Sequence, residues 1–210
     1  MVGRAAQVLG VCQEMGCEIV RLQETSNWRS DQSTLLQAGH IVYSSGRPGG
    51  KGAGKKGQRG VGLAVRKMIC RAEVRSPEFI SSRLLPKMTL ELCGRARAVT
   101  FVIGHVPTDT EAAGEKHAFC TVLDRVIKGV SEHEQLFALV VANARTGRGG
   151  EGGFGNEQCK VLGAFGRDTL DDNGERLLAF SVNYSLALLD IFFSNTKNAT
   201  SHTFNSRGEK

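Results

Sequence analysis

The sequence has no apolar run long enough to cross a membrane and no signal-peptide pattern. Although 40% of its 210 residues are hydrophobic, no apolar run approaches the roughly 20 residues that a membrane-spanning helix requires. The first residues, MVGRAAQVLGVCQEMG, place the acidic Glu14 close behind a short apolar stretch and lack a cleavage-site pattern. We therefore expect a globular intracellular protein without a membrane partner, with nucleus and cytoplasm left open.

The sequence also lacks closely spaced cysteines. No CxxC pair occurs, so the cysteine pattern indicates neither a zinc ribbon nor a disulfide framework. We expect reduced and mostly buried thiols. The six cysteines are Cys12, Cys17, Cys70, Cys93, Cys120 and Cys159.

Acidic residues are absent between Gln32 and Ala72. This stretch carries eight positive residues, more than the formal net charge of +6 of the whole chain, so the basicity is local. A local basic stripe suits a polyanion, because neutralising phosphates releases condensed counterions. A loop of glycine and lysine can equally be merely solvated. The positive residues are Arg47, Lys51, Lys55, Lys56, Arg59, Arg66, Lys67 and Arg71.

Apolar residues at three- and four-residue intervals predict three helices. The first covers residues 4–15 and ends at Gly16. The second runs from Thr110, as its N-cap, to Lys128. The third covers residues 174–184 and buries Leu177, Leu178 and Phe180. The stripe of the second helix expected to be buried is Phe119, Val122, Leu123, Val126 and Ile127.

Strands and loops alternate with these helices. We expect strands at residues 17–22, 40–43, 61–65, 88–93, 97–102, 136–142 and 186–193. The strands on either side of Gly94 form a hairpin, and the apolar run 136–142 is covered on both faces. Two glycine-rich segments, 44–60 and 146–155, are expected to be loops. The sequence thus predicts an α/β protein with a mixed sheet, in one domain over residues 1–210.

The first of these loops contains formal matches to two nucleotide-binding motifs. Gly52–Gly57 fits GxGxxG and Gly49–Lys55 fits GxxxxGK. A phosphate cradle requires a helix N-terminus after the loop, whereas GVGLAV, a strand-like run, follows here. We interpret both matches as accidents of glycine content.

Seven short segments, in order along nearly the whole chain, resemble one family. They resemble the exonuclease–endonuclease–phosphatase superfamily, and most closely the endonuclease domain of non-LTR retrotransposons and its domesticated relatives, the craniofacial development protein 2-like proteins. The segments are VRLQET (20–25), GVGLAVR (60–66), GHVPT (104–108), VANARTG (141–147), LGAFGRD (162–168), DNGERLLAF (172–180) and DIFF (190–193).

The resemblance implies a fold and a reaction. The fold is a pair of packed mixed sheets flanked by helices, a four-layer α/β/β/α sandwich, here shortened at both ends relative to the family. The reaction is hydrolysis of phosphate esters with a divalent cation, Mg²⁺ or Mn²⁺. Such chemistry needs carboxylates around a hard cation, a base that deprotonates water, and donors for charge on the phosphoryl oxygens.

The resemblance also assigns candidate catalytic residues. Glu24 matches the metal-ligating glutamate, and Asn143 matches an asparagine that positions the phosphate, so both are expected in one pocket. His105 stands at a tyrosine position and could donate a hydrogen bond to phosphate, or be structural. Arg145 could bind phosphate oxygens bidentately, or be a surface arginine. Candidate nucleic-acid-binding residues are Lys55, Lys56, Arg59 and Arg145.

Departures from the family pattern leave the enzymatic activity open. The family's essential aspartate two positions before the asparagine is Val141 here, and valine cannot accept a proton. The family's asparagine on its first strand and its final aspartate–histidine pair have no counterparts either. We expect an impaired endonuclease acting on nucleic acid, with DNA favoured over RNA. The alternative is a catalytically inactive module that binds nucleic acid, or that binds a protein or itself through exposed sheet edges.

Overall fold

The computed structural model describes residues 2–23, 33–37, 39–47, 58–75, 83–147, 161–163, 165 and 169–192. The chain divides into two compact units, Met1–Ala142 and Asn143–Lys210. Each unit has its own packing and is described by itself. The expectation of one domain over residues 1–210 stays a prediction.

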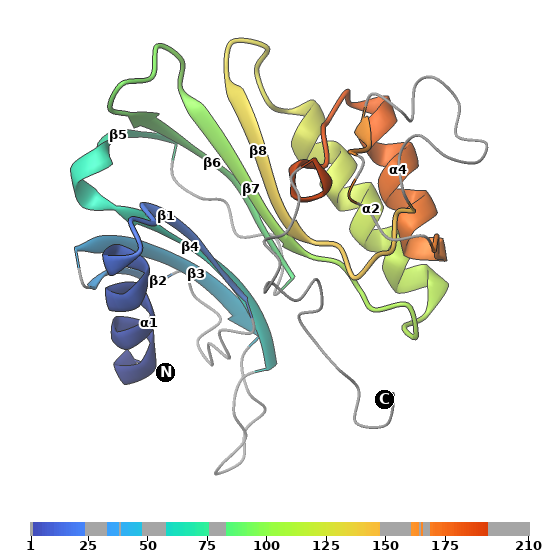
Figure 1. The fold of residues 1–210 in the computed structure, drawn as a ribbon, viewed down its shortest axis with the longest axis horizontal. Coiled ribbons are helices and arrows are strands. Elements are labelled where there is room, and N and C mark those ends of the chain that lie inside the picture. The colour runs from blue at the N-terminus through green and yellow to red at the C-terminus, as the bar shows by residue number, and fades with distance from the viewer. Residues whose placement is uncertain are drawn as a thin grey trace. The chain divides into compact units, whose positions relative to one another are not determined.

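The first unit contains two four-stranded sheets (Figure 1). Sheet A has the strand order β1-β4-β3-β2, and all its pairs are antiparallel. Sheet B has the order β5-β6-β7-β8, and its β7–β8 pair is parallel while the others are antiparallel. The strands of sheet A are β1 (Ile19–Gln23), β2 (Ser33–Gln37), β3 (His40–Arg47) and β4 (Gln58–Arg66). Those of sheet B are β5 (Cys70–Arg75), β6 (Leu84–Leu92), β7 (Val99–His105) and β8 (Gln135–Val141).

The two sheets pack face to face through one hydrophobic core. Alternate residues of a strand point to the same side of its sheet. Every second residue along the central parts of β4, β6 and β7 therefore reaches this core. Burying such side chains is the main favourable term in folding. The core residues are Tyr43, Val61, Leu63 and Val65 from sheet A, and Met88, Leu90, Leu92, Val99, Phe101 and Ile103 from sheet B.

Helix α1 (Val2–Glu14) lies on the face of sheet A that is turned away from sheet B (Figure 1). Leu9 is fully buried there against Val42 and Ala64. The helix ends as predicted, because Gly16 takes the left-handed conformation with φ of 74°. The Gly16 N–H then donates to the Gln13 carbonyl and the Cys17 N–H to the Cys12 carbonyl, which satisfies the last turn.

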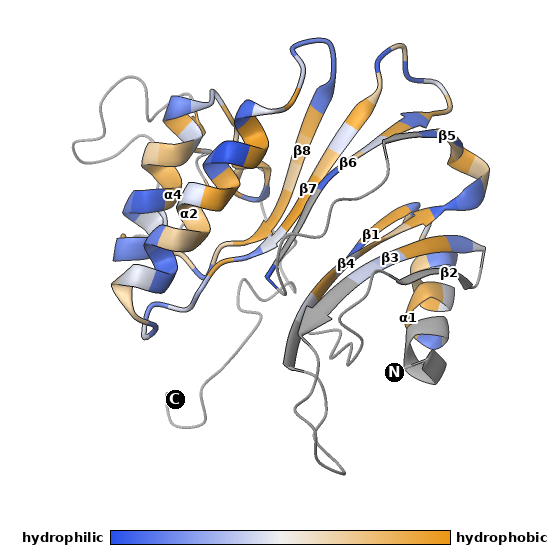
Figure 2. Cartoon of the chain, turned by 180° about the vertical axis from the view of Figure 1, so that it is seen from behind, coloured by the Kyte–Doolittle hydropathy of each residue, from blue (hydrophilic) through white to orange (hydrophobic). Residues whose placement is uncertain are grey.

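Helix α2 (Ala113–Lys128) lies alongside sheet B, on the face away from sheet A. Its apolar stripe is buried at Phe119, Leu123, Val126 and Ile127, as predicted, while Val122 is half-buried. Figure 2 shows hydrophobic residues along β7 and β8 and hydrophilic residues in the loop before β8. The first unit therefore has four layers: helix, sheet, sheet and helix.

The second unit contains helix α4 (Asp172–Asn183) and the short 3-10 helix η2 (Leu189–Ile191). The predicted third helix is confirmed, with Leu178 buried and Leu177 and Phe180 half-buried. The predicted strand over 186–193 is wrong, because residues 189–191 turn into η2. Leu188 and Ile191 of this run pack in a small cluster with α4 instead of in a sheet, while Leu189 and Phe192 are exposed. This cluster contains Val161, Leu162 and Leu178, with Val182, Leu188 and Ile191 against it.

Other expectations also need correction. Residues 44–47 and 58–60 of the predicted loop belong to β3 and β4, because cross-strand pairing, as between Arg47 and Gln58, extends the ladder into the glycine-rich segment. Residues 48–57 lie outside the described residues, as do 148–155 of the second predicted loop. Strands β2 and β5 were not expected. The run 136–142 forms most of β8, but it is only partly buried and not covered on both faces. Among the described strands, β8 is the last of its sheet.

The thiols are less buried than expected. Among the described residues, Cys12, Cys17, Cys70, Cys93 and Cys120 form no disulfide. Cys17 and Cys93 are exposed and the other three are half-buried, so the expectation of mostly buried thiols is wrong. Cysteines are small enough to be tolerated at strand and helix ends, where these two lie. Cys159 lies outside the described residues.

The predicted fold class is confirmed: an α/β protein with two packed sheets flanked by helices. Within the described residues, no helix is both long enough and apolar enough to cross a membrane.

One polar side chain enters the core between the sheets. The Tyr43 side chain is 2% exposed, and its hydroxyl donates to Glu73 Oε2 at 2.8 Å. Burial raises the pKa of the Tyr43 phenol well above its ordinary value, and the hydrogen bond and negative charge of Glu73 raise it further. The folded protein therefore resists ionisation of Tyr43.

We expect this phenol to make folding sensitive to alkaline pH. In the unfolded chain Tyr43 ionises near pH ~10, whereas in the folded chain it stays neutral, so stability is intact below that pH and falls above it. Between pH 9 and 11, the wild type should lose about 1 kcal/mol more than Tyr43→Phe. Urea unfolding at both pH values measures this difference. Equal losses in the two proteins would contradict it, since Tyr184, the other tyrosine of the chain, is common to both.

Candidate functional site

The parallel pair β7 and β8 ends at two positions that the sequence singled out. The last pair in their register is His105 with Val141, and the Val106 N–H donates to the Val141 carbonyl at 2.9 Å. Both side chains are half-buried. His105 and Val141 therefore lie side by side at the carboxyl ends of two parallel strands, where binding sites of α/β sheets commonly form.

The segment between β7 and α2 is fixed by charged side chains. Glu111 accepts a hydrogen bond from the Thr108 N–H at 2.7 Å and forms an ion pair with Arg83. Because Glu111 folds back in this way, the helix begins at Ala113, with Ala112 as N-cap, and the predicted cap at Thr110 is wrong.

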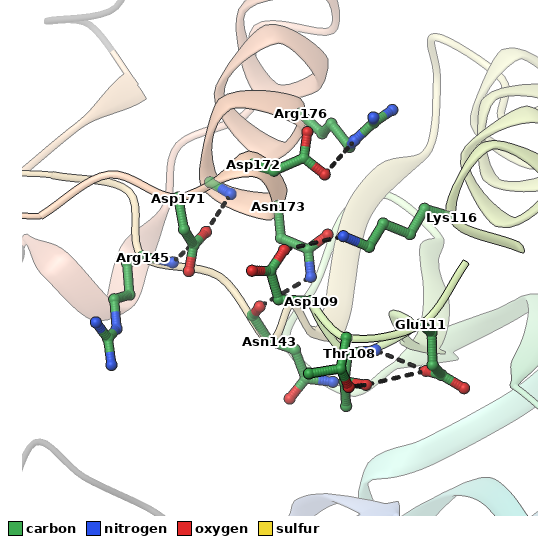
Figure 3. Close-up of polar contacts among 12 residues, drawn as sticks. Thr108, Asp109, Glu111, Lys116, Asn143, Arg145, Asp171, Asp172, Asn173 and Arg176 are labelled. Atoms are coloured by element: carbon green, nitrogen blue, oxygen red, sulfur yellow. Dashed lines mark hydrogen bonds and ion pairs between the residues drawn. The ribbon is translucent and has the colours of Figure 1, made fainter. Parts of the chain in front are cut away.

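A second ion pair joins this segment to α2. The ammonium group of Lys116, whose side chain is 7% exposed, lies 2.9 Å from Asp109 Oδ1. A buried lysine is costly without such a partner, so Asp109 is held close to the first turn of α2. Figure 3 shows the Lys116–Asp109 ion pair and the contact of Glu111 with Thr108. The sequence reasoning missed this network.

In the second unit, Asn143 has an unusual backbone conformation. Its φ of 47° lies in the left-handed region, which non-glycine residues rarely adopt, asparagine more readily than most. Its carbonyl oxygen accepts a hydrogen bond from Asn173 Nδ2 at 3.0 Å. Asn173 is 3% exposed, and the contact is partly buried.

The first turn of α4 also holds Arg145. The carboxylate of Asp171, the N-cap of α4, accepts from the Arg145 N–H at 3.0 Å and from the Gly174 N–H at 2.7 Å. In return the Asp171 N–H donates to the Arg145 carbonyl at 3.1 Å. An isolated bridge between Thr146 and Leu170 continues the pairing. The segment 143–147 is thereby clamped to the start of α4.

The side chains of this clamped segment project the other way. Figure 3 shows the Asn143 side chain on the side of the segment opposite Asn173, and the guanidinium of Arg145 extending away from α4. Arg145 is exposed and Asn143 is half-buried. An amide and a guanidinium presented in this manner are both suited to donating hydrogen bonds to an oxyanion.

Several predicted site residues lie outside the described residues. These are Glu24, Lys55 and Lys56, so the expected convergence of Glu24 with Asn143 stays a prediction. Arg59 lies in β4. Among the described residues, no group of three or more histidine, cysteine, aspartate or glutamate side chains is placed to hold a metal ion. The expected Mg²⁺ or Mn²⁺ site rests on Glu24 and stays a prediction.

The third helix was predicted to begin at Gly174, although the segment DNGERLLAF begins at Asp172. Asp171 and Asn173 were therefore not predicted as supports of the site. A signal was present in the run Asp171, Asp172 and Asn173. Such residues are strongly preferred where a helix begins. A helix start at this run would have placed Asp171 as a cap and Asn173 on the first turn.

Comparison with known proteins gave similarity at the level of solved structures. No family model matches the chain, and no curated protein matches it. An AP endonuclease from Archaeoglobus fulgidus is 15% identical, with a TM-score of 0.47 over 85% of this chain and 64% of its own. A humanized D. rerio TDP2 with 14 mutations is 15% identical, with a TM-score of 0.46 over 68% of this chain and 59% of its own. D. rerio TDP2 complexed with single strand DNA product is 14% identical, with a TM-score of 0.45 over 68% and 54%. This chain thus spans less than two thirds of the length of each.

We predict that Gly174→Ala disrupts the clamp. A β-carbon at Gly174 would overlap the Arg145 carbonyl oxygen, so either the segment 143–147 or the first turn of α4 must move. Hydrogen exchange of the Arg145 amide should accelerate at least about tenfold, corresponding to a loss of ~1.4 kcal/mol. Gly114→Ala in α2 is the matched control, because a β-carbon there meets nothing within 4 Å. Unchanged exchange at Arg145 in Gly174→Ala would show that the clamp is not tight.

Proposed function

We propose that this chain is a nucleic-acid-binding domain of the exonuclease–endonuclease–phosphatase type whose phosphodiester hydrolysis is strongly impaired. The seven ordered sequence segments support the family assignment, and two packed sheets flanked by helices are compatible with it. The observation that carries the proposal is the register of β7 and β8, which sets Val141 beside His105.

The impairment follows from the chemistry of Val141. This position corresponds to the aspartate that the resemblance requires for activating water or stabilising the transition state. An isopropyl group neither accepts a proton nor forms a hydrogen bond. General acid–base assistance is worth about 10²–10⁴ in rate, so its loss reduces hydrolysis by a factor of that order. His105, across the strand pair, keeps an imidazole that can hydrogen-bond a phosphate.

Binding of nucleic acid requires hydrogen-bond donors and positive charge, but not the proton acceptor that hydrolysis needs. The clamped segment presents the Asn143 amide and the Arg145 guanidinium, and guanidinium groups bind phosphate oxygens bidentately. The acid-free stretch between Gln32 and Ala72 adds positive charge, which favours a polyanion. We therefore expect affinity for nucleic acid to persist where catalysis is weak.

Three finer features belong to the same proposal. The preference for DNA over RNA, the retroelement subtype and a requirement of residual activity for Mg²⁺ or Mn²⁺ are supported by the sequence resemblance. The metal would be held by Glu24. When bound, such a cation stabilises negative charge on phosphoryl oxygens.

The binding part predicts a salt-dependent affinity for DNA. Fluorescence anisotropy with a labelled duplex of about 20 base pairs, between 50 and 200 mM NaCl, should show the binding constant falling steeply with salt. Replacing Lys55, Lys56 and Arg59 with alanine should weaken binding. It should also reduce the slope of log K against log salt by up to ~2.7, or ~0.9 for each phosphate that is no longer neutralised.

The control for this experiment removes three positive charges elsewhere. Arg125 and Lys128 lie in the last turn of α2, and Arg176 lies on α4. Alanine at these three positions changes the net charge equally and should leave most of the slope intact. An affinity insensitive to salt, or equal losses in the two triple variants, would contradict nucleic-acid binding through the basic stretch.

The impairment part predicts a gain of activity in Val141→Asp. Restoring a carboxylate beside His105 supplies the missing proton acceptor, so nicking of supercoiled plasmid with Mg²⁺ should accelerate at least about 100-fold over the wild type. Agarose gel electrophoresis of the relaxed form measures the rate.

Two variants control the nicking assay. Val141→Asn has nearly the shape of the aspartate variant but no carboxylate, and should stay as slow as the wild type. Adding Glu24→Ala to Val141→Asp should abolish the gain if Glu24 holds the metal. Wild-type nicking as fast as that of Val141→Asp would refute the impairment.

A further inference from the structure

The left-handed conformation of Asn143 needs a restraint. Residues in sparsely populated backbone regions are strained and persist when their surroundings fix them. Asn143 follows β8 by two positions and has φ of 47°. This backbone angle also sets the direction of the Asn143 side chain, because it fixes the direction of the Cα–Cβ bond relative to the rest of the segment.

A buried side chain provides one restraint on Asn143. Asn173 Nδ2 donates to the Asn143 carbonyl at 3.0 Å, and Asn173 is 3% exposed on the first turn of α4. Two positions after Asn143, the Arg145 N–H donates to the Asp171 carboxylate, which holds this part of the segment 143–147. Thus Asp171 fixes where the segment lies, while Asn173 fixes the peptide that follows Asn143.

We propose that Asn173 is a positioning residue, which holds the backbone of Asn143 so that the Asn143 side chain is presented to a phosphodiester of bound nucleic acid. This inference rests on the proposed function. The two asparagines have different roles in this arrangement. Asn173 faces the segment from α4, and the Asn143 side chain lies on the opposite side of the segment (Figure 3). Asn173 itself touches no ligand in this arrangement.

The most direct test is the isosteric change Asn173→Asp. It replaces the Nδ2 donor with a carboxylate oxygen that faces the Asn143 carbonyl oxygen, so an attraction becomes a repulsion. Duplex affinity should fall about 3- to 10-fold, the equivalent of one hydrogen bond. Asn183→Asp is the matched control, because it adds the same charge to the last turn of the same helix at an exposed position.

A double-mutant cycle separates positioning from general loss of structure. If Asn173 acts through Asn143, then Asn173→Asp weakens binding in the wild type but adds nothing in the Asn143→Ala background. Circular dichroism melting verifies that each variant is folded. If the aspartate variant does not fold, Asn173→Ala removes the donor without repulsion and enters the same cycle.

Each outcome decides between the two ideas. Asn143→Ala alone tests the proposed function: unchanged duplex affinity means that Asn143 contacts no phosphate, and the positioning role falls with it. If Asn143→Ala weakens binding while Asn173→Asp does not, the proposed function stands and the positioning role is overturned. An equal loss from Asn173→Asp in both backgrounds also overturns it, since the effect then bypasses Asn143.

Discussion

The fold and the candidate site both depend on the burial of β7. Six of its seven residues are buried: Val99, Phe101 and Ile103 reach the core between the sheets, and Thr100 bonds Thr89 on the other face. A slip of one residue would exchange the two faces of β7 and place Thr100 in the core. Pairing with β6 on one side and β8 on the other therefore has a single register, and this register sets His105 beside Val141.

Elements with a strong local pattern were predictable from the sequence, and elements defined by distant partners were not. The hairpin around Gly94 and the helix ending at Gly16 have alternation or periodicity and a turn residue within a few positions. By contrast β5, with the sequence CRAEVR, is irregularly paired to β6, and its strand conformation derives from that partner. The run around η2 is as apolar as a buried strand, but it packs against residues 161 and 178, which periodicity does not reveal.

The same distinction applies to the candidate site. Motif resemblance singled out Asn143, and Arg145 became a candidate as the arginine two positions after it. Their backbone conformation is set by Asp171 and Asn173, 26 and 30 positions further along the chain. Sequence order gives no measure of such contacts, although a cluster of helix-capping residues was visible. The candidate residue types were thus visible in the sequence, whereas the contacts that fix their backbone required coordinates.

Under the proposed function, binding of nucleic acid and its hydrolysis depend on different groups of this framework. Binding can therefore persist where hydrolysis is lost. Binding of a phosphodiester draws on donors and positive charge, which the clamped segment keeps through contacts that do not involve Val141. Hydrolysis also needs a proton acceptor, which the side chain of Val141 cannot supply. Replacing a carboxylate by valine at a half-buried strand end also removes the cost of burying a charge. Such a change is therefore compatible with the fold, and under the proposed function it would separate binding of the substrate from its cleavage.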